Sequence, residues 1–234
     1  RGITRQEMDA YAVWSHQKAA RAEEQGKLAP AIVPVVVTHS DGSPVLDGAG
    51  EPILVTQDEG IRPDTTLEGL ARLKPCFRPD GRVTAGTSSQ TNDCAAFVVL
   101  ASGEKARQLG VRPLARLRSF AVAGCPAEQM GLGPIYAVPK ALRRAGVTVA
   151  DLDVIELNEA FAAQAIPCCR ELKFPLEKVN PWGGAIALGH PLGCTGAILV
   201  GKVIDYLTET GGQLGLVCMC IGGGMGAAGV VEML

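Results

Sequence analysis

The sequence predicts an α/β fold in which helices pack on mixed β-sheets. Runs of β-branched and other apolar residues alternate along the chain with segments whose apolar residues recur at helical spacing. Glycine, proline and Asp-Gly turn signals separate these segments. The chain has 234 residues, of which 47% are hydrophobic and 20% charged, so it can bury a substantial core.

The first element is a predicted helix. Thr4 and Glu7 have the spacing of a capping box, in which a hydroxyl and a carboxylate each accept from a free backbone N–H group. Small and apolar residues then recur at helical spacing up to Gly26, a residue typical of a helix C-cap. The β-branched run at 31–38 predicts a strand, and Pro34 within it indicates an edge or a bulge.

The next stretch predicts a hairpin and one short helix. Asp-Gly pairs at 41–42 and 47–48 are turn signals. Thr65 and Glu68 form a second predicted capping box, for a helix over 66–73. The residues that follow this helix are expected to be irregular.

The remaining elements alternate as a layered α/β fold requires. Ala95 to Ala101 is apolar throughout, which predicts a buried strand, and Ser102 caps a helix that ends at Gly110. The elements expected after it are a strand at 113–123, a helix at 135–145, a strand at 154–157, helices at 159–172 and 197–210, and strands at 214–221 and 227–233.

Charge and hydropathy exclude several classes of protein. A formal net charge of -2 provides no basic field for nucleic acid and no polybasic tail for a membrane surface. The apolar runs are far shorter than the roughly 20 residues that a membrane-spanning helix needs. No signal-peptide pattern opens the chain. We therefore expect a protein of the bacterial cytoplasm or of an organellar matrix, not a secreted one.

The eight cysteines do not indicate a metal site. None of them forms a C-x-x-C pair, which argues against a zinc ribbon or a thioredoxin motif. Most lie in apolar or glycine-rich surroundings, as reduced core cysteines do. We expect no bound metal and a reducing compartment.

A glycine-rich loop carries the most informative histidine. Residues 180–197 hold five glycines and two prolines around His190, which excludes ordinary helix or strand. The loop runs into a predicted helix N-terminus, so His190 is a candidate general base or oxyanion donor. For His16 and His39 a structural role is the favoured interpretation.

Two further candidates follow predicted strands, where open α/β sheets bind ligands. Asn158 comes directly after the strand at 154–157, and Cys220 ends the strand at 214–221, against Gly222 to Gly224. Cys220 can equally be a core residue, although the adjacent glycines favour a ligand site.

Two loop positions leave their role open. Arg62 lies before a predicted helix, where a solvated charge and a phosphate contact are equally plausible. Residues 85–90 offer two adjacent hydroxyls beside a glycine, an arrangement that grips ligands in some loops and is only a loop in most.

Four motifs together resemble the thiolases. Three of them are Asn158-Glu-Ala-Phe, the Gly-Gly-Ala-Ile-Ala-Leu-Gly-His190-Pro-Leu-Gly run, and Cys220-Ile-Gly-Gly-Gly-Met-Gly. The stretch from Val83 to Asp93 is similar to the coenzyme A loop of that family. The likeness extends from the first helix to the last residue, and its variants are most similar to degradative 3-ketoacyl-CoA thiolases. It implies the layered thiolase fold, with this chain as the C-terminal half of a duplicated architecture.

The resemblance also implies that an essential group is missing. Thiolases carry their nucleophilic cysteine, in a Cys-x-Ser-Gly-like context, in an N-terminal half, and no cysteine here has that setting. The chain also begins with Arg1 close to a helix cap. We therefore expect a fragment or a processed subunit, inactive alone, whose N-terminal half lies on another chain.

The family pattern implies a role for each candidate in the chemistry. His190 would activate the nucleophile and donate to a thioester oxygen, beside a water held by Asn158. Cys220 would exchange a proton with the acetyl methyl group, with its pKa lowered from about 8.5 by neighbouring groups. The backbone N–H of Gly222 would join a second oxyanion hole.

For coenzyme A, which would be a substrate and not a permanent cofactor, the resemblance implies a further set of contacts. Thr87, Gln90 and the bulky Trp182 depart from the family pattern, and this leaves the acyl-chain preference open. The implied binding residues are Arg62 at the nucleotide end, Ser89 and Ala85 at the pantetheine arm, and Phe77, Met130 and Phe161 on the apolar walls.

Domain division and assembly follow from the same likeness. Residues 1–112 would end the N-terminal half, and 113–234 would form the C-terminal domain. We expect a homo- or hetero-oligomer, because a missing half would leave exposed strand edges.

A non-catalytic acyl-CoA-binding subunit is the alternative function. A decarboxylating condensing enzyme is disfavoured, because such enzymes usually lack a cysteine at the position of Cys220.

Overall fold

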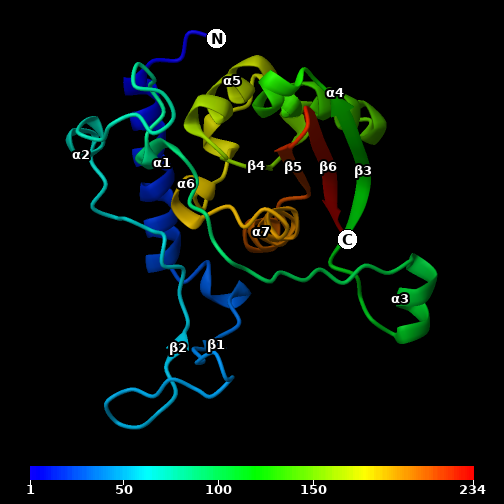
Figure 1. The fold of residues 1–234 in the computed structure, drawn as a ribbon. Coiled ribbons are helices and arrows are strands. Elements are labelled where there is room, and N and C mark those ends of the chain that lie inside the picture. The colour runs from blue at the N-terminus through cyan, green and yellow to red at the C-terminus, as the bar shows by residue number, and fades with distance from the viewer.

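A four-stranded mixed sheet forms the centre of the computed structural model, which describes residues 1–234 (Figure 1). Its strand order is β3-β6-β5-β4. The antiparallel pairs are β3 with β6 and β6 with β5, whereas β5 and β4 are parallel. The strands are β3 (Ala115–Gly124), β4 (Val154–Leu157), β5 (Leu214–Ile221) and β6 (Met225–Met233).

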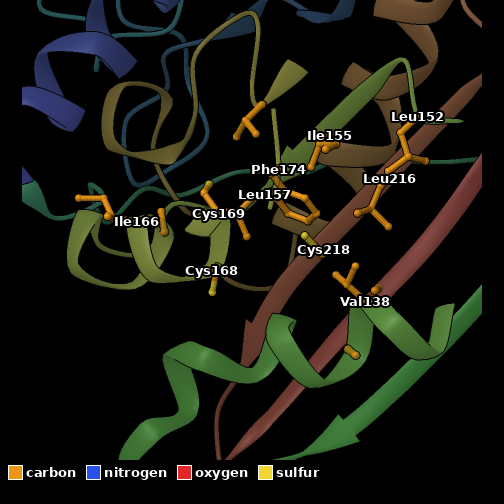
Figure 2. Close-up of a cluster of buried hydrophobic side chains, with 14 of the residues drawn as sticks. Val138, Leu152, Ile155, Leu157, Ile166, Cys168, Cys169, Phe174, Leu216 and Cys218 are labelled. Carbon is orange, nitrogen blue, oxygen red and sulfur yellow. The ribbon is translucent and has the colours of Figure 1, made fainter. Parts of the chain in front are cut away.

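Helices cover both faces of this sheet. Figure 1 shows α4 (Gly133–Ala145) and α5 (Ala162–Leu172) on one face and α7 (Thr195–Thr210) on the other. The first face carries the main hydrophobic cluster of 26 buried residues, and six more pack under α7. Figure 2 shows how Val138, Ile166 and Leu216 bring α4, α5 and β5 into this main cluster.

The N-terminal part of the chain surrounds this core. α1 (Arg5–Glu24) is the longest helix and lies beside the short α6 (Ala185–Leu188) (Figure 1). Thr4 caps α1 and forms the predicted capping box with Glu7. The smaller elements are α2 (Leu67–Ala71), a 3-10 helix at Ala85–Thr87, α3 (Gly103–Leu109), and a two-stranded ribbon of β1 (Val35–Val36) and β2 (Leu54–Val55).

The fold class and most elements of the C-terminal part are confirmed. The strand expected at 214–221 has those bounds, and α4 and β3 differ from expectation by one or two residues at an end. Ser102 caps α3, and Gly110 ends it with a φ of 65°. Caps and apolar spacing act locally, which is why the sequence predicts these elements well.

The strand predicted at Ala95–Ala101 is wrong. This segment forms no strand, and Phe97, Val99 and Leu100 are exposed by 92%, 94% and 85%. In Figure 1 the chain before α3 runs past α7 as an extended trace. A strand needs a neighbouring strand for its backbone hydrogen bonds, and no strand of this chain pairs with it.

Four smaller corrections concern element bounds and caps. Only Val35–Val36 is a strand within the run expected at 31–38, and it is exposed. Thr66, not Thr65, caps α2. The helix expected from Glu159 begins at Ala162, and the glycine-rich loop contains the helical turn α6.

No helix in the described chain, residues 1–234, has both the length and the apolar character needed to cross a membrane.

Candidate active site

Asn158 and His190 meet at the carboxyl end of β4. The backbone N–H of Asn158 donates to the carbonyl of Cys218 at 2.9 Å, which continues the parallel ladder between β4 and β5. The side-chain Nδ2 of Asn158 lies 3.3 Å from Nε2 of His190. Two predicted residues, 32 positions apart in the chain, are therefore in direct contact.

The partners of His190 define its tautomer. Thr195 Oγ1 lies 2.7 Å from His190 Nδ1 and 3.2 Å from the carbonyl of Pro191, and when it donates to this carbonyl it accepts from Nδ1. With the hydroxyl in this orientation, Nδ1 carries the proton, and Nε2 accepts from the Asn158 amide. Burial lowers the pKa of His190, which also favours the neutral ring. A neutral imidazole with a free Nε2 lone pair can act as a base.

Close backbone packing fixes the loop that presents His190. The backbone N–H of His190 donates to the carbonyl of Gln90 at 3.0 Å. Gly189 has a φ of 91°, and a Cβ added there would lie 2.0 Å from Oδ1 of Asn92. A glycine is therefore required directly before the histidine.

Asn158 leaves one polar atom without a partner. Its Oδ1 is buried and forms no hydrogen bond within the chain, although Asn158 is only 1% exposed. A buried amide oxygen of this kind is normally satisfied by water or a ligand. The free Oδ1 therefore fits the role of holding a water or a substrate donor.

Cys220 is the penultimate residue of β5, close to the glycine turn and opposite Gly226 on β6. Its side chain is buried, and Gly223 and Gly224 beyond it turn the chain with positive φ. Burial raises the pKa of the Cys220 thiol, and the nearby Cys125 raises it further. The expectation of a lowered pKa is therefore wrong in this chain, because no positive charge offsets the desolvation of the thiolate.

The expected coenzyme A loop pairs with the segment that follows Asn158. The backbone N–H of Ser89 donates to Ala160 at 3.0 Å, and Ser88 forms an antiparallel bridge with Phe161. Phe77 packs edge-on against Phe161, with ring centroids 5.8 Å apart. Ala85 lies on the 3-10 helix just before Ser89. Four predicted binding residues therefore lie in one region of the fold, namely Phe77, Ala85, Ser89 and Phe161.

Arg62 and Met130 lie on other segments. The backbone N–H of Arg62 donates to His16 Nδ1, and its guanidinium donates to the carbonyl of Gly60, so His16 has the structural contact expected of it. Gln90 Nε2 donates to the same Gly60 carbonyl and so links this segment to the loop before His190. Met130 is half-buried in a 3-10 helix at Ala127–Leu132, against the start of α4.

Sequence reasoning missed two residues of the site. Thr195 holds Nδ1 of His190, and a hydroxyl five residues after the histidine on the same glycine-rich loop was the available signal. Glu159 is fully buried and accepts four hydrogen bonds directly beside Asn158. Its position inside a polar motif after a buried strand was the only sign of this.

The site offers an imidazole and an amide in direct contact, and Cys220 lies on β5, the strand that pairs with β4. The two ring nitrogens of His190 contact Asn158 and Thr195, and no thiol of the chain forms a hydrogen bond with either. Nowhere in residues 1–234 do three His, Cys, Asp or Glu side chains gather in a way that would hold a metal ion. An imidazole in contact with an amide can supply acid–base chemistry.

Comparison with known proteins gives consistent matches along the whole chain. Residues 1–104 match the sequence family described as "Thiolase, N-terminal domain", and residues 111–233 match "Thiolase, C-terminal domain". The human peroxisomal 3-ketoacyl-CoA thiolase is 54% identical over 232 residues, which cover 99% of this chain and 54% of that protein. The 3-ketoacyl-CoA thiolase of Bacillus subtilis (strain 168) is 53% identical over 99% of this chain and 59% of its own length.

Solved structures match equally well. The acetyl-CoA acetyltransferase of Bacillus anthracis superposes with a TM-score of 0.92 at 42% identity, over 99% of this chain and 57% of that one. The dimeric peroxisomal thiolase of Saccharomyces cerevisiae gives a TM-score of 0.89 at 44% identity, over 99% and 55%. This chain therefore spans little more than half the length of the relatives that it matches.

Proposed function

The chain belongs to the thiolase family, and on that premise we propose that it supplies the acid–base part of a 3-ketoacyl-CoA thiolase site. The reaction would be the cleavage of a 3-ketoacyl-CoA by coenzyme A, or the reverse Claisen condensation. The observation that carries this proposal is the position of His190 between Asn158 and Thr195, where Nε2 faces the Asn158 amide and Nδ1 faces the Thr195 hydroxyl.

His190 and Asn158 would act on the nucleophile and on the thioester. The Nε2 lone pair would take the proton of an attacking thiol, and the resulting imidazolium would then donate to the thioester oxygen. The unpaired Oδ1 of Asn158 supports a bound water beside that oxygen. One oxyanion donor of this kind contributes about 3 kcal/mol to the lowering of a barrier.

Cys220 and Gly222 would complete the chemistry. When the carbon–carbon bond breaks, the acetyl-CoA carbanion would take the thiol proton of Cys220, and the thiolate would recover a proton from the incoming coenzyme A thiol. The raised pKa of Cys220 is consistent with a proton donor that is charged before cleavage in only a small fraction of molecules. Gly222 is exposed after the strand, which leaves its backbone N–H available for an oxyanion.

Coenzyme A would lie along the loop that pairs with Phe161. In this proposal Ser89 and Ala85 contact the pantetheine arm, and Phe77, Met130 and Phe161 line the acyl tunnel. Arg62, which is exposed, would bind the nucleotide end. The edge-on packing of Phe77 on Phe161 supports the assignment of the apolar wall.

The nucleophile would come from outside this chain. No thiol here hydrogen bonds to either nitrogen of His190, and the relatives are nearly twice as long. We keep the division into residues 1–112 and 113–234 as part of this proposal, together with association into an oligomer. The peroxisomal and bacterial relatives favour an organellar matrix or a bacterial cytoplasm.

A chimera tests the assignment. The first half of the Bacillus subtilis relative would be fused to this chain, and thiolysis of acetoacetyl-CoA would be followed by loss of its enolate absorbance. We expect turnover by the chimera and none by the chain alone. His190→Ala or Cys220→Ser in the chimera should reduce kcat by at least a hundredfold, whereas Thr208→Ala on the exposed end of α7 should not. Turnover by the chain alone would contradict the proposal.

A non-catalytic acyl-CoA-binding subunit remains the second candidate. It would bind coenzyme A through the same loop, and the chimera would show no turnover. The unpaired Oδ1 of Asn158 beside a base-competent imidazole favours the catalytic function. Binding of coenzyme A that is unchanged by His190→Ala, together with an inactive chimera, would favour the subunit.

A further inference from the structure

The carboxylate of Glu159 accepts four hydrogen bonds, and the proposed chemistry does not use it. It is fully buried. Oε1 accepts from the Tyr11 hydroxyl at 3.1 Å and from Nδ2 of Asn180 at 2.8 Å. Oε2 accepts from the Ser15 hydroxyl at 2.7 Å and from the backbone N–H of Ile186 at 3.2 Å.

These four donors come from two places that converge on the His190 loop. Tyr11 and Ser15 lie on α1, whereas Asn180 and Ile186 lie at the start of the loop and on α6, whose last residue is two positions before His190. The carboxylate therefore connects the long helix to the loop that presents the imidazole.

Backbone contacts tighten the same connection. The Ser15 hydroxyl also accepts from the backbone N–H of Gly184 at 3.2 Å. A Cβ on Gly184 would lie only 2.1 Å from Cδ of Glu159, so the loop backbone rests directly on the carboxylate. Asn180 in turn donates to and accepts from the backbone of Leu157, the last residue of β4.

A buried ion pair supports the loop from the side of α7. Lys202 Nζ lies 2.9 Å from Oε2 of Glu156 and donates to the carbonyl of Gly183 at 2.6 Å. Lys18 on α1 donates to the carbonyl of Val179 at 2.6 Å. Three buried charged side chains, Lys18, Lys202 and Glu159, thus hydrogen bond to backbone groups in or directly before the loop. A buried charge is costly without such partners.

We propose that Glu159 is a positioning residue, which fixes the His190 loop on α1 so that the imidazole reaches the amide of Asn158. Asn158 is its neighbour in the chain, so one short segment sets the position of both members of the pair. The contact between Asn158 and His190 is seen in the structure, and only the expected effect on kcat rests on the proposed function.

Glu159→Gln is the variant that tests this. It keeps the shape of the side chain but replaces one acceptor oxygen by an NH₂ group, which would face two donors on whichever side it lies. The readout is the ¹⁵N spectrum of histidine-labelled chain, in which only three histidines contribute. In the wild type we expect His190 to show one protonated Nδ1 and one bare Nε2. In Glu159→Gln we expect averaged tautomers.

Two controls separate positioning from general loss of stability. Glu177→Gln changes an exposed carboxylate just before the same loop and should leave the His190 signals unchanged. Leu207→Ala destabilises the core under α7 but lies far along that helix from Thr195, so it should lower the midpoint of unfolding and spare the tautomer. His39, exposed in the hairpin, serves as an internal reference in each spectrum.

Ser15→Ala covers the case in which Glu159→Gln does not fold. It removes one donor to the carboxylate and one acceptor for Gly184, and we expect a smaller shift of the His190 signals in the same direction. Unchanged His190 tautomers in a folded Glu159→Gln or Ser15→Ala variant would overturn the proposal.

A kinetic measurement on the chimera then links positioning to turnover. Glu159→Gln should lower kcat at least tenfold and change KM for acetoacetyl-CoA less than twofold, because binding surfaces are left intact. A change in KM with an unchanged kcat would overturn the positioning role. An inactive wild-type chimera with the expected spectra would refute the proposed function and leave the positioning role standing.

Discussion

At the residue scale, the state of His190 follows from its neighbours. Thr195 has a single hydroxyl proton, and when the carbonyl of Pro191 receives it, the imidazole donates from Nδ1. His190 was predictable as a candidate site residue from its glycine-rich surroundings. The tautomer was not, because it depends on which atoms the folded loop brings within hydrogen-bonding distance.

The lowered pKa of His190 gives the first prediction. Burial favours the neutral ring in the folded state, so below about pH 6.5 the unfolded chain binds more protons than the folded one. The stabilisation that comes from burying a neutral His190 is therefore lost as the pH falls. Urea denaturation should show that His190→Gln destabilises the chain less at pH 5.5 than at pH 7.5. An equal or larger cost at pH 5.5 would contradict the burial of a neutral imidazole.

Thiol reactivity gives the second prediction. Burial raises the pKa of Cys220, whereas Cys76 is exposed, so iodoacetamide at pH 7.5 should alkylate Cys76 much faster. Peptide mass spectrometry over a time course measures both rates in one sample. Cys220 labelled as fast as Cys76 would show that its thiolate is stabilised by a group not seen in the structure.

At the element scale, local signals were sufficient wherever both packing partners lie within the chain. The capping box at Thr4 and the αL glycine at Gly110 predicted helix ends correctly. The strand expected at Ala95–Ala101 failed because an apolar run specifies burial but cannot supply a partner. The short α6 was not predicted, because the glycines that flank it indicate turns and not a helix.

Two glycines provide a matched prediction about packing between elements. A Cβ on Gly226 of β6 would lie 2.1 Å from the carbonyl carbon of Gly133, where α4 begins, and backbone cannot move aside cheaply. Gly226→Ala should therefore destabilise the chain by several kcal/mol, about 3 or more. Gly201 in α7 has no atom near its added Cβ, so Gly201→Ala should stabilise by about 0.5–1 kcal/mol. Similar midpoints of urea unfolding for both would contradict this packing.

At the scale of the whole molecule, exposed apolar side chains lie in the segment before α3 and on the outer strand β3 of the central sheet. Phe97, Val99 and Leu100 are almost fully exposed, and Phe120 and Val122 on the outer strand β3 are half exposed. Such surface is unusual for a monomer and favours association. The sequence predicted a buried strand for Phe97, Val99 and Leu100, and only the structure shows that this chain does not cover them.

This surface gives a prediction about assembly. Sedimentation velocity of the chain should show association that increases with concentration, and Phe97→Asp should weaken it. Glu104→Gln on the exposed side of α3 serves as the control and should have no effect. A chain that stays monomeric up to high micromolar concentration would show that the segment before α3 is shielded in solution.

The position of the acyl group tests the central claim most directly. If this chain supplies the base and another segment supplies the nucleophile, then the chimera treated with ¹⁴C-acetyl-CoA and quenched in acid should carry the label on a cysteine of the added half. Peptide mapping should find none on the eight cysteines of this chain. Stoichiometric acetylation of Cys220, or of any other cysteine within residues 1–234, would contradict the account.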